Sequence, residues 1–188
     1  LHVRPLVNIK DEAGVKQLVS IATAISDLVL EFGGSLSGEH GDGIVRGVFM
    51  EKMFGSQIYN VFRDVKRAFD PQSIMNPGKI IDCPPLEDNL RISPQSRTWE
   101  PATKFDFSAD QGFARSVELC NGVGACRQVL SGTMCPSYMA TREEEHSTRG
   151  RANALRAVIG GMLPASEFTS QRLFRVLDLC LECKGCKS

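Results

Sequence analysis

The distribution of cysteines constrains this chain more than any other feature of its sequence. The chain has 188 residues and seven cysteines, and six of the seven follow residue 119. An odd number of cysteines without a secretory signal argues against a disulfide framework. Thiols clustered in this way indicate metal binding in a reducing compartment.

The clustered cysteines form two runs with different spacing. The first run is Cys120-x5-Cys126-x8-Cys135, followed by Pro136, and the second run is a C-x2-C-x2-C triplet that ends at Cys186. In two-cluster ferredoxins the fourth cysteine of each run ligates the other cluster. By this rule one complete site has four ligands, which are Cys135, Cys180, Cys183 and Cys186.

The second site would hold Cys120 and Cys126, together with a cysteine beyond Ser188. Val123 occupies the position of the middle cysteine in the first run and offers no lone pair, so one iron there would be unheld. Zinc is the alternative metal, but zinc sites use C-x2-C pairs. The triplet and the Cys135-Pro136 pair therefore favour an iron–sulfur site over a zinc site.

Elsewhere the chain shows conventional signals of secondary structure. Residues 1–10 predict a β-strand, and apolar residues at helical spacing predict two long helices before residue 70. A glycine-rich loop over 35–47 separates these helices, and Pro77-Gly78 predicts a turn. Further helices are expected near 111–119, 147–159 and 170–180.

The glycine-rich loop contains the sequence Gly38-Glu-His-Gly-Asp-Gly43. Glycines on both sides allow a close approach of the backbone to a ligand, so Glu39 and His40 can both face a cleft. A carboxylate beside an imidazole suits a divalent metal or acid–base chemistry. A charged surface loop remains the alternative. His2 is a second candidate, although a lone histidine near a chain start is usually structural.

Three motifs together resemble the carboxyl part of FAD-linked oxidases of the vanillyl-alcohol-oxidase type. The motifs are His2-Val-Arg-Pro5, Ser37-Gly-Glu-His-Gly-Asp-Gly43 and Met75-Asn-Pro-Gly-Lys-Ile80. Similar relatives are D-lactate dehydrogenases, the glycolate oxidase flavin subunit and D-2-hydroxyglutarate dehydrogenases. The resemblance implies FAD as cofactor and a small D-2-hydroxy acid as substrate.

The same resemblance implies roles for individual residues. His2 and Glu39 would bind a divalent metal, zinc or manganese, and His40 would take the hydroxyl proton of the substrate. Arg4 stands where some relatives carry Asn, and it could pair with a substrate carboxylate. A turn returning toward the flavin would contain Asn76, Gly78 and Lys79.

The second half resembles the iron–sulfur subunits of glycolate oxidase and of anaerobic glycerol-3-phosphate dehydrogenase. The likeness lies in Cys135-Pro-Ser-Tyr138 and Ser147-Thr-Arg-Gly-Arg151. It implies [4Fe–4S] at the complete site. Related respiratory subunits with an aliphatic residue in place of the middle cysteine imply [3Fe–4S], or a four-iron cluster with a labile corner, at Cys120 and Cys126. Alternatively, these two cysteines are packing thiols.

The helix between the two cysteine runs carries many charges. The pattern of charges over 146–156 predicts that most of these side chains lie on a solvated helix face. For Arg149 and Arg151 the alternative is that their positive charges stabilise a negatively charged cluster.

The expected fold is α+β. Residues 1–82 would form an incomplete FAD-linked oxidase C-terminal domain with helices on an antiparallel sheet, and 83–110 would form a linker. Residues 111–188 would form an all-α, ferredoxin-like two-cluster module, truncated at its end. The chain starts without Met and stops after a cysteine cluster, which suggests a segment of a longer protein.

The expected function is oxidation of D-lactate, glycolate or D-2-hydroxyglutarate, with electrons passing from FAD through the clusters to a quinone or a downstream redox module. The isolated segment should be inactive. Rival functions are a non-catalytic electron-transfer adaptor and a zinc-stabilised interaction module.

Charge and apolar content bear on partners and location. The formal net charge is zero, which argues against nucleic acid as a partner. No apolar run approaches the length that is expected to span a bilayer. A cytoplasmic location is expected, with peripheral contact at the inner membrane face left open.

Overall fold

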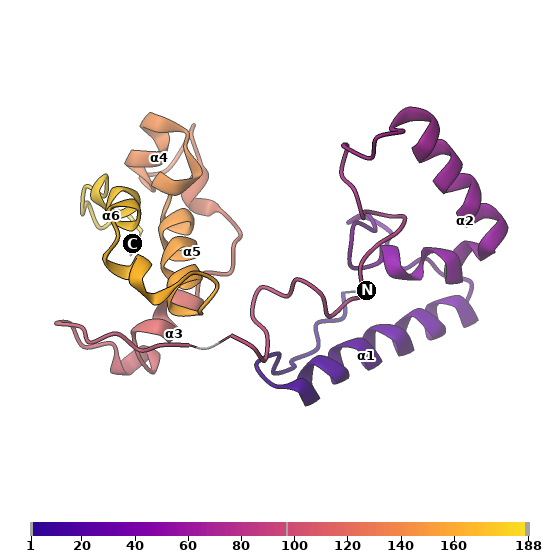
Figure 1. The fold of residues 1–188 in the computed structure, drawn as a ribbon, viewed down its shortest axis with the longest axis horizontal. Helices are drawn as coiled ribbons and strands as arrows, with labels where there is room; N and C mark the ends of the chain where they lie inside the picture. Colours follow the sequence, from indigo (N-terminus) through magenta and orange to yellow (C-terminus); the bar gives the residue numbers. More distant parts are fainter. Residues whose placement is uncertain (1, 97, 187–188) are drawn as a thin grey trace. The chain divides into compact units, whose positions relative to one another are not determined.

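The computed structural model describes residues 2–96 and 98–186, which divide into two compact units. One unit ends at Pro94 and the other starts at Gln95. The α-helices in the described residues, shown in Figure 1, are α1 (Glu12–Glu31), α2 (Met50–Phe69), α3 (Phe113–Glu118), α4 (Pro136–Thr141), α5 (Thr148–Ile159) and α6 (Gln171–Asp178). Short 3-10 helices connect them, namely η1 (Gly47–Phe49), η2 (Ser108–Asp110), η3 (Ala125–Arg127), η4 (Glu144–His146) and η5 (Ala165–Thr169).

The predicted α+β fold is wrong for the residues that the structure describes. Residues 2–96 and 98–186 contain helices, turns and irregular segments, but no β-strand and no antiparallel sheet. The segment over 2–8, predicted as a strand, has no regular structure. A strand exists only when neighbouring backbone completes its hydrogen-bond ladder, and no described segment lies beside this one in that way.

Local signals account for the start and end of α1. The Asp11 carboxylate accepts a hydrogen bond of 2.6 Å from the backbone N–H of Gly14, which satisfies a donor left free in the first turn. At the other end, Gly33 has a φ of 64°, a conformation in which glycine carries no steric penalty. The helix predicted between Asp11 and Gly33 is therefore confirmed.

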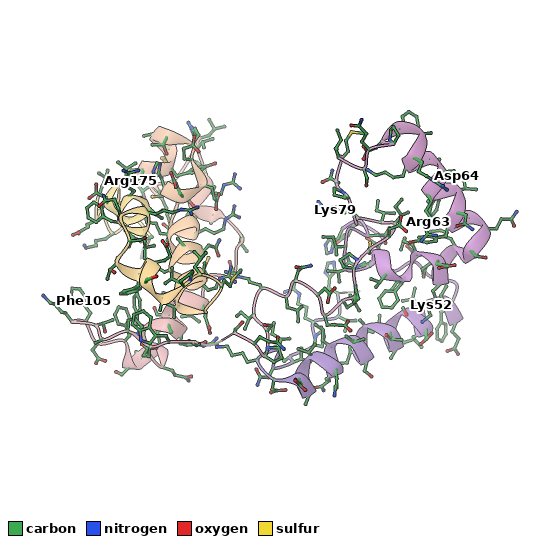
Figure 2. All side chains as sticks on the ribbon, in the orientation of Figure 1. Lys52, Arg63, Asp64, Lys79, Phe105 and Arg175 are labelled. Atoms are coloured by element: carbon green, nitrogen blue, oxygen red, sulfur yellow. The ribbon has the colours of Figure 1, made fainter. Side chains whose placement is uncertain are left out.

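Helix α1 corrects the expectation about apolar length. It has 20 residues and a mean hydropathy of 1.4, so by length and composition alone it could cross a membrane. It nevertheless carries Lys16 and Asp27, and Asp27 forms an ion pair with Lys52 of α2. The Lys52 ammonium, labelled in Figure 2, also donates to the hydroxyl of Ser26, which is fully buried. These contacts bind α1 to α2.

The second long helix is kinked at Gly55, which has φ 78° and ψ 159°. Its buried side chains, Met50 and Tyr59, pack with Ile81 as the core of the first unit. The Tyr59 hydroxyl also accepts a hydrogen bond of 2.9 Å from the backbone N–H of Asp82. Core packing and this hydrogen bond thus attach the segment after the 75–79 turn to α2.

Asp70 ends α2 and organises the turn that follows. Its buried carboxylate accepts hydrogen bonds from the backbone N–H groups of Ile74 and Met75, at 3.0 and 2.9 Å. The Lys66 ammonium pairs with the same carboxylate and reaches the carbonyl of Met75. The bond from Lys66 is the largest cause of a lowered Asp70 pKa, and the two backbone bonds add to it against the opposing effect of burial.

At the end of the glycine-rich loop, Gly47 lies close to the Cys83 thiol and to the backbone of Ile80. A Cβ atom on Gly47 would lie 2.2 Å from the sulfur of Cys83 and 3.1 Å from the backbone nitrogen of Ile80. Ile80 donates a backbone hydrogen bond of 2.8 Å to the carbonyl of Gly43. The loop can therefore rest against residues 80–83 only because position 47 has no side chain.

Helix α5 is the central element of the second unit and contacts α3, α6, η4 and η5. Its N-cap, Ser147, is fully buried and accepts a hydrogen bond of 2.9 Å from the N–H of Gly150. The core contains buried side chains from α3 and α5, with further apolar side chains packed against them: Ala114, Val117, Ile159, Phe113, Leu155 and Phe168.

We expect Asp70→Asn to lower the stability of the first unit near neutral pH, because the charge that Lys66 and two N–H groups favour is lost. A carboxylate with a depressed folded-state pKa stabilises above its unfolded pKa, and this contribution disappears as pH falls through the folded value. The difference in thermal midpoint between wild type and variant should therefore shrink as pH falls below the ordinary value of 3.8. Asp64→Asn, at an exposed carboxylate paired with Arg67, is the matched control. A gap that is constant between neutral and acid pH would contradict this account.

We also expect Gly47→Ala to destabilise the protein by about 1–3 kcal/mol through overpacking against the Cys83 sulfur. Gly38→Ala in the same loop meets no atom within 4 Å and should change the free energy of unfolding by less than about 0.5 kcal/mol. Cys83→Ala removes the clashing sulfur, so the Gly47→Ala cost should be smaller in that background when urea unfolding is measured. Strict additivity of the two substitutions would show that the contact is not the cause.

Candidate functional site

Two imidazoles and a carboxylate meet in the first unit. His2 lies in the segment before α1, whereas Glu39 and His40 lie in the loop between α1 and α2. The same oxygen of Glu39, Oε1, lies 2.6 Å from Nε2 of His2 and 2.9 Å from Nε2 of His40. The two imidazole rings stack with centroids 5.1 Å apart and planes 9° apart. Residues 37 positions apart in sequence are thus brought into one cluster.

The geometry of this cluster suits a metal site with open coordination positions. One ligand atom from each residue lies within 4.8 Å of the others, and all three side chains are exposed. Two histidines and one carboxylate are the protein ligands of many catalytic zinc and non-haem iron sites, which keep positions free for substrate. The residue types and their convergence therefore fit a divalent cation.

In both histidines Nε2 is the ring nitrogen that contacts Glu39, at 2.6 Å in His2 and 2.9 Å in His40. Nδ1 of His40 takes no part in this contact. A carboxylate that orients an imidazole in this way supports acid–base chemistry.

The other predicted residues of the first unit are not among the three side chains of this cluster. Lys79 donates a hydrogen bond of 3.1 Å to the side-chain oxygen of Asn76, and Gly78 has a φ of 69°, as the central glycine of the predicted turn requires. Arg4 is exposed. Among the described residues, no hydrogen bond links Arg4, Asn76, Gly78 or Lys79 to the cluster.

In the second unit the four cysteines of the complete site line a single cavity of about 240 Å³: Cys135, Cys180, Cys183 and Cys186. Ser137 donates a hydrogen bond of 2.5 Å from its hydroxyl to the carbonyl of Leu179, which attaches α4 to the end of α6. Residues about 45 positions apart are thereby held at one cavity. Cys135 is buried, whereas the three cysteines after α6 are exposed.

The surroundings of Cys135 favour its thiolate. Burial acts first and would raise the pKa of this thiol, but hydrogen bonds from the backbone N–H groups of Tyr138 and Ser137 and from Arg151 lower it overall. Iron–sulfur ligation requires the deprotonated sulfur. The donor set therefore fits an iron–sulfur cluster, with the four thiols as ligands and the cavity as its site.

Arg149 anchors the first cysteine run. Its backbone N–H donates to the sulfur of Cys126 at 3.3 Å, and Nη1 donates to the carbonyl of Gly122 at 2.8 Å. Glu144 binds the same guanidinium at two points, 2.8 and 3.1 Å, and this pairing is the largest cause of the raised Arg149 pKa. Coulombic attraction to Cys126 and Cys120 raises the Arg149 pKa further. Arg149 therefore ties the 120–126 loop to α5.

Sequence patterns missed one element of this second site. Helix α4 was not predicted, although Pro136 at its first position is a recognised start signal. Arg151 is only 8% exposed, so it does not belong to the solvated face expected for most side chains over 146–156. The role expected for it instead, steadying a negatively charged cluster, stays a prediction.

In comparisons with known protein families, each half of the chain matches one family. Residues 1–80 match the family described as FAD linked oxidases, C-terminal domain, and residues 119–188 match the family described as 4Fe-4S dicluster domain. No solved structure matches the chain.

Individual relatives agree with these two families. A D-2-hydroxyglutarate dehydrogenase of Pseudomonas putida is 38% identical over 160 residues, which cover 83% of this chain and 15% of the relative. A D-lactate dehydrogenase of Archaeoglobus fulgidus is 36% identical over 81 residues, covering 43% of this chain and 17% of the relative. The glycolate oxidase subunit GlcD of Escherichia coli is 47% identical over 57 residues, covering 30% and 11%.

The chain thus spans less than a fifth of the length of each of these relatives. The resemblance predicted from the sequence is confirmed for both halves. Residues 1–80 belong to the C-terminal domain family of FAD-linked oxidases, and residues 119–188 belong to the 4Fe-4S dicluster domain family.

Proposed function

We propose that this chain is part of a flavin- and iron–sulfur-dependent dehydrogenase that oxidises a D-2-hydroxy acid. The observation that carries the proposal is that one chain joins the His2–Glu39–His40 cluster to a cavity lined by four cysteines. The first arrangement suits a hydroxy acid and a metal, and the second suits electron transfer. The relatives' names make D-2-hydroxyglutarate, D-lactate and glycolate the substrates to test.

His2 and Glu39 are proposed to hold a divalent cation, zinc or manganese. The cation would bind the hydroxyl and carboxylate oxygens of the substrate and so favour loss of the hydroxyl proton. Nδ1 of His40, free of the hydrogen bond to Glu39, would take that proton. Arg4 would bind the substrate carboxylate, since a guanidinium can donate two parallel hydrogen bonds to it.

FAD, when bound, supplies the hydride acceptor. The turn with Asn76, Gly78 and Lys79 is proposed to face the flavin, and the bond between Asn76 and Lys79 keeps its shape. The cysteines of the second unit would hold iron–sulfur clusters, which supply electron transfer toward a quinone or a further redox module. A reducing compartment such as the cytoplasm suits seven free cysteines, with membrane contact at most peripheral.

Replacing His40 with Gln in the cluster-loaded flavoprotein tests the proposed base. The expected result is a fall of about 10²–10⁴-fold in the rate of substrate-driven flavin reduction, because the hydroxyl proton has no acceptor. The measurement is anaerobic stopped-flow absorbance with each of the three hydroxy acids. His146→Gln is the control, since that histidine hydrogen-bonds to Thr141 in the second unit.

Metal analysis of the same variants separates the possible roles of the histidines. His2→Gln should lose the divalent metal, whereas His40→Gln should keep it. Loss of metal from His40→Gln would make His40 a third ligand instead of the base, and an unchanged rate of flavin reduction would exclude a catalytic role for it.

We further propose that Cys120 and Cys126 hold a [3Fe–4S] cluster, or a four-iron cluster with a labile corner. Val123 offers no ligand atom, and Arg149 fixes the loop that carries both cysteines. Low-temperature EPR of the air-oxidised protein should show a three-iron signal that disappears in Val123→Cys. A single four-iron cluster that survives Cys120→Ser and Cys126→Ser would show that these two cysteines are packing thiols.

A further inference from the structure

Arg151 is a buried cation without a carboxylate partner among the residues that the structure describes. It lies in the first turn of α5 and is 8% exposed. Nε donates to the carbonyl of Val176 at 3.2 Å, and Nη1 points to the sulfur of Cys135 at 3.6 Å. The remaining nitrogen, Nη2, is buried and has no hydrogen-bond partner within the described residues.

A buried guanidinium with an unpaired N–H group is unfavourable unless a hydrogen-bond acceptor or a negative charge lies beside it. Taking a guanidinium out of water is unfavourable, and a buried donor without a partner adds to that cost. Arg149, two residues earlier on the same helix, shows the usual solution, because its guanidinium is paired at two points with Glu144. Arg151 has no equivalent carboxylate in the described residues.

The location of Arg151 indicates which negatively charged group could pair with its guanidinium. Arg151 lines the same cavity as Cys135, Cys180, Cys183 and Cys186. We propose that Arg151 is the counter-charge of the iron–sulfur cluster in this cavity, that its Nη2 donates a hydrogen bond to a cluster sulfur, and that it raises the reduction potential of that cluster. This inference rests on the iron–sulfur cluster proposed above.

The direction of the effect follows from charge. Four thiolates outnumber the positive charge of a four-iron core in both of its usual redox states, so the whole complex is an anion. Reduction adds one more negative charge, and a fixed cation nearby stabilises the reduced complex more than the oxidised one. Net charge and hydrogen bonds to the sulfurs are among the factors that set the potentials of such clusters.

The test compares Arg151→Gln and Arg151→Lys with the wild-type protein in its cluster-loaded form. Arg172→Gln is the control, because Arg172 is an exposed arginine of the same unit, on α6. The reduction potential is measured by anaerobic potentiometric titration followed by EPR, and iron and sulfide are counted in each sample. Finding zinc without iron or sulfide in the wild type would refute the proposed function itself, before any variant is compared.

With iron and sulfide present in the wild type, Arg151→Gln should shift the potential downward. The expected shift is at least a tenfold change in the ratio of oxidised to reduced cluster at a fixed potential, about 59 mV for one electron. Arg151→Lys keeps the charge and should shift the potential less, and Arg172→Gln should leave it unchanged. If Arg151→Gln loses the cluster while Arg151→Lys keeps it, the need for a positive charge is supported.

Three results would overturn the proposal. The first is an intact cluster in Arg151→Gln with an unchanged potential. The second is an equal downward shift in Arg151→Lys and Arg151→Gln, which would show that the charge is irrelevant. The third is loss of the cluster from both variants, which would make Arg151 a structural tie between α5 and α6.

Discussion

The second unit depends on the hydrogen bonds that hold the C-terminal cysteines against Cys135. The Ser137 hydroxyl donates to the carbonyl of Leu179, and Nε of Arg151 donates to the carbonyl of Val176. Both acceptors lie at the end of α6, just before Cys180. Together with the packing of α6 on α5, these two bonds place the start of the cysteine triplet beside Cys135 and offset the entropy cost of closing a loop of about 45 residues.

In each unit a glycine allows two chain segments to approach closely beside a candidate site. In the first unit Gly47 allows the loop of Glu39 and His40 to rest against Cys83. In the second unit a Cβ on Gly150 would lie 1.9 Å from the carbonyl oxygen of Glu144, so α5 can begin directly beside η4. The same crowding brings Glu144 within reach of the Arg149 guanidinium, and thus stabilises the first cysteine run.

Features with local causes could be predicted from the sequence, whereas features with distant causes could not. Asp11 and Ser147 cap helices through their own next turn, so the starts of α1 and α5 were predictable. The strand expected over residues 1–10 required a neighbouring strand, which alternation within one segment cannot supply. The pairing of His2 with Glu39 and the burial of Arg151 depend on contacts between remote segments, and residue spacing indicated only that these side chains were candidates.

Exposure differs between the two sides of the four-cysteine cavity. Cys135 is buried beneath α5, whereas Cys180, Cys183 and Cys186 are exposed. Oxidants reach exposed sulfur atoms first, so oxidation of the cluster-free site is expected to begin at the C-terminal triplet and not at Cys135. The same accessibility lets an iron donor reach the triplet first, so cluster assembly would start on the exposed side of the cavity and finish at the buried Cys135.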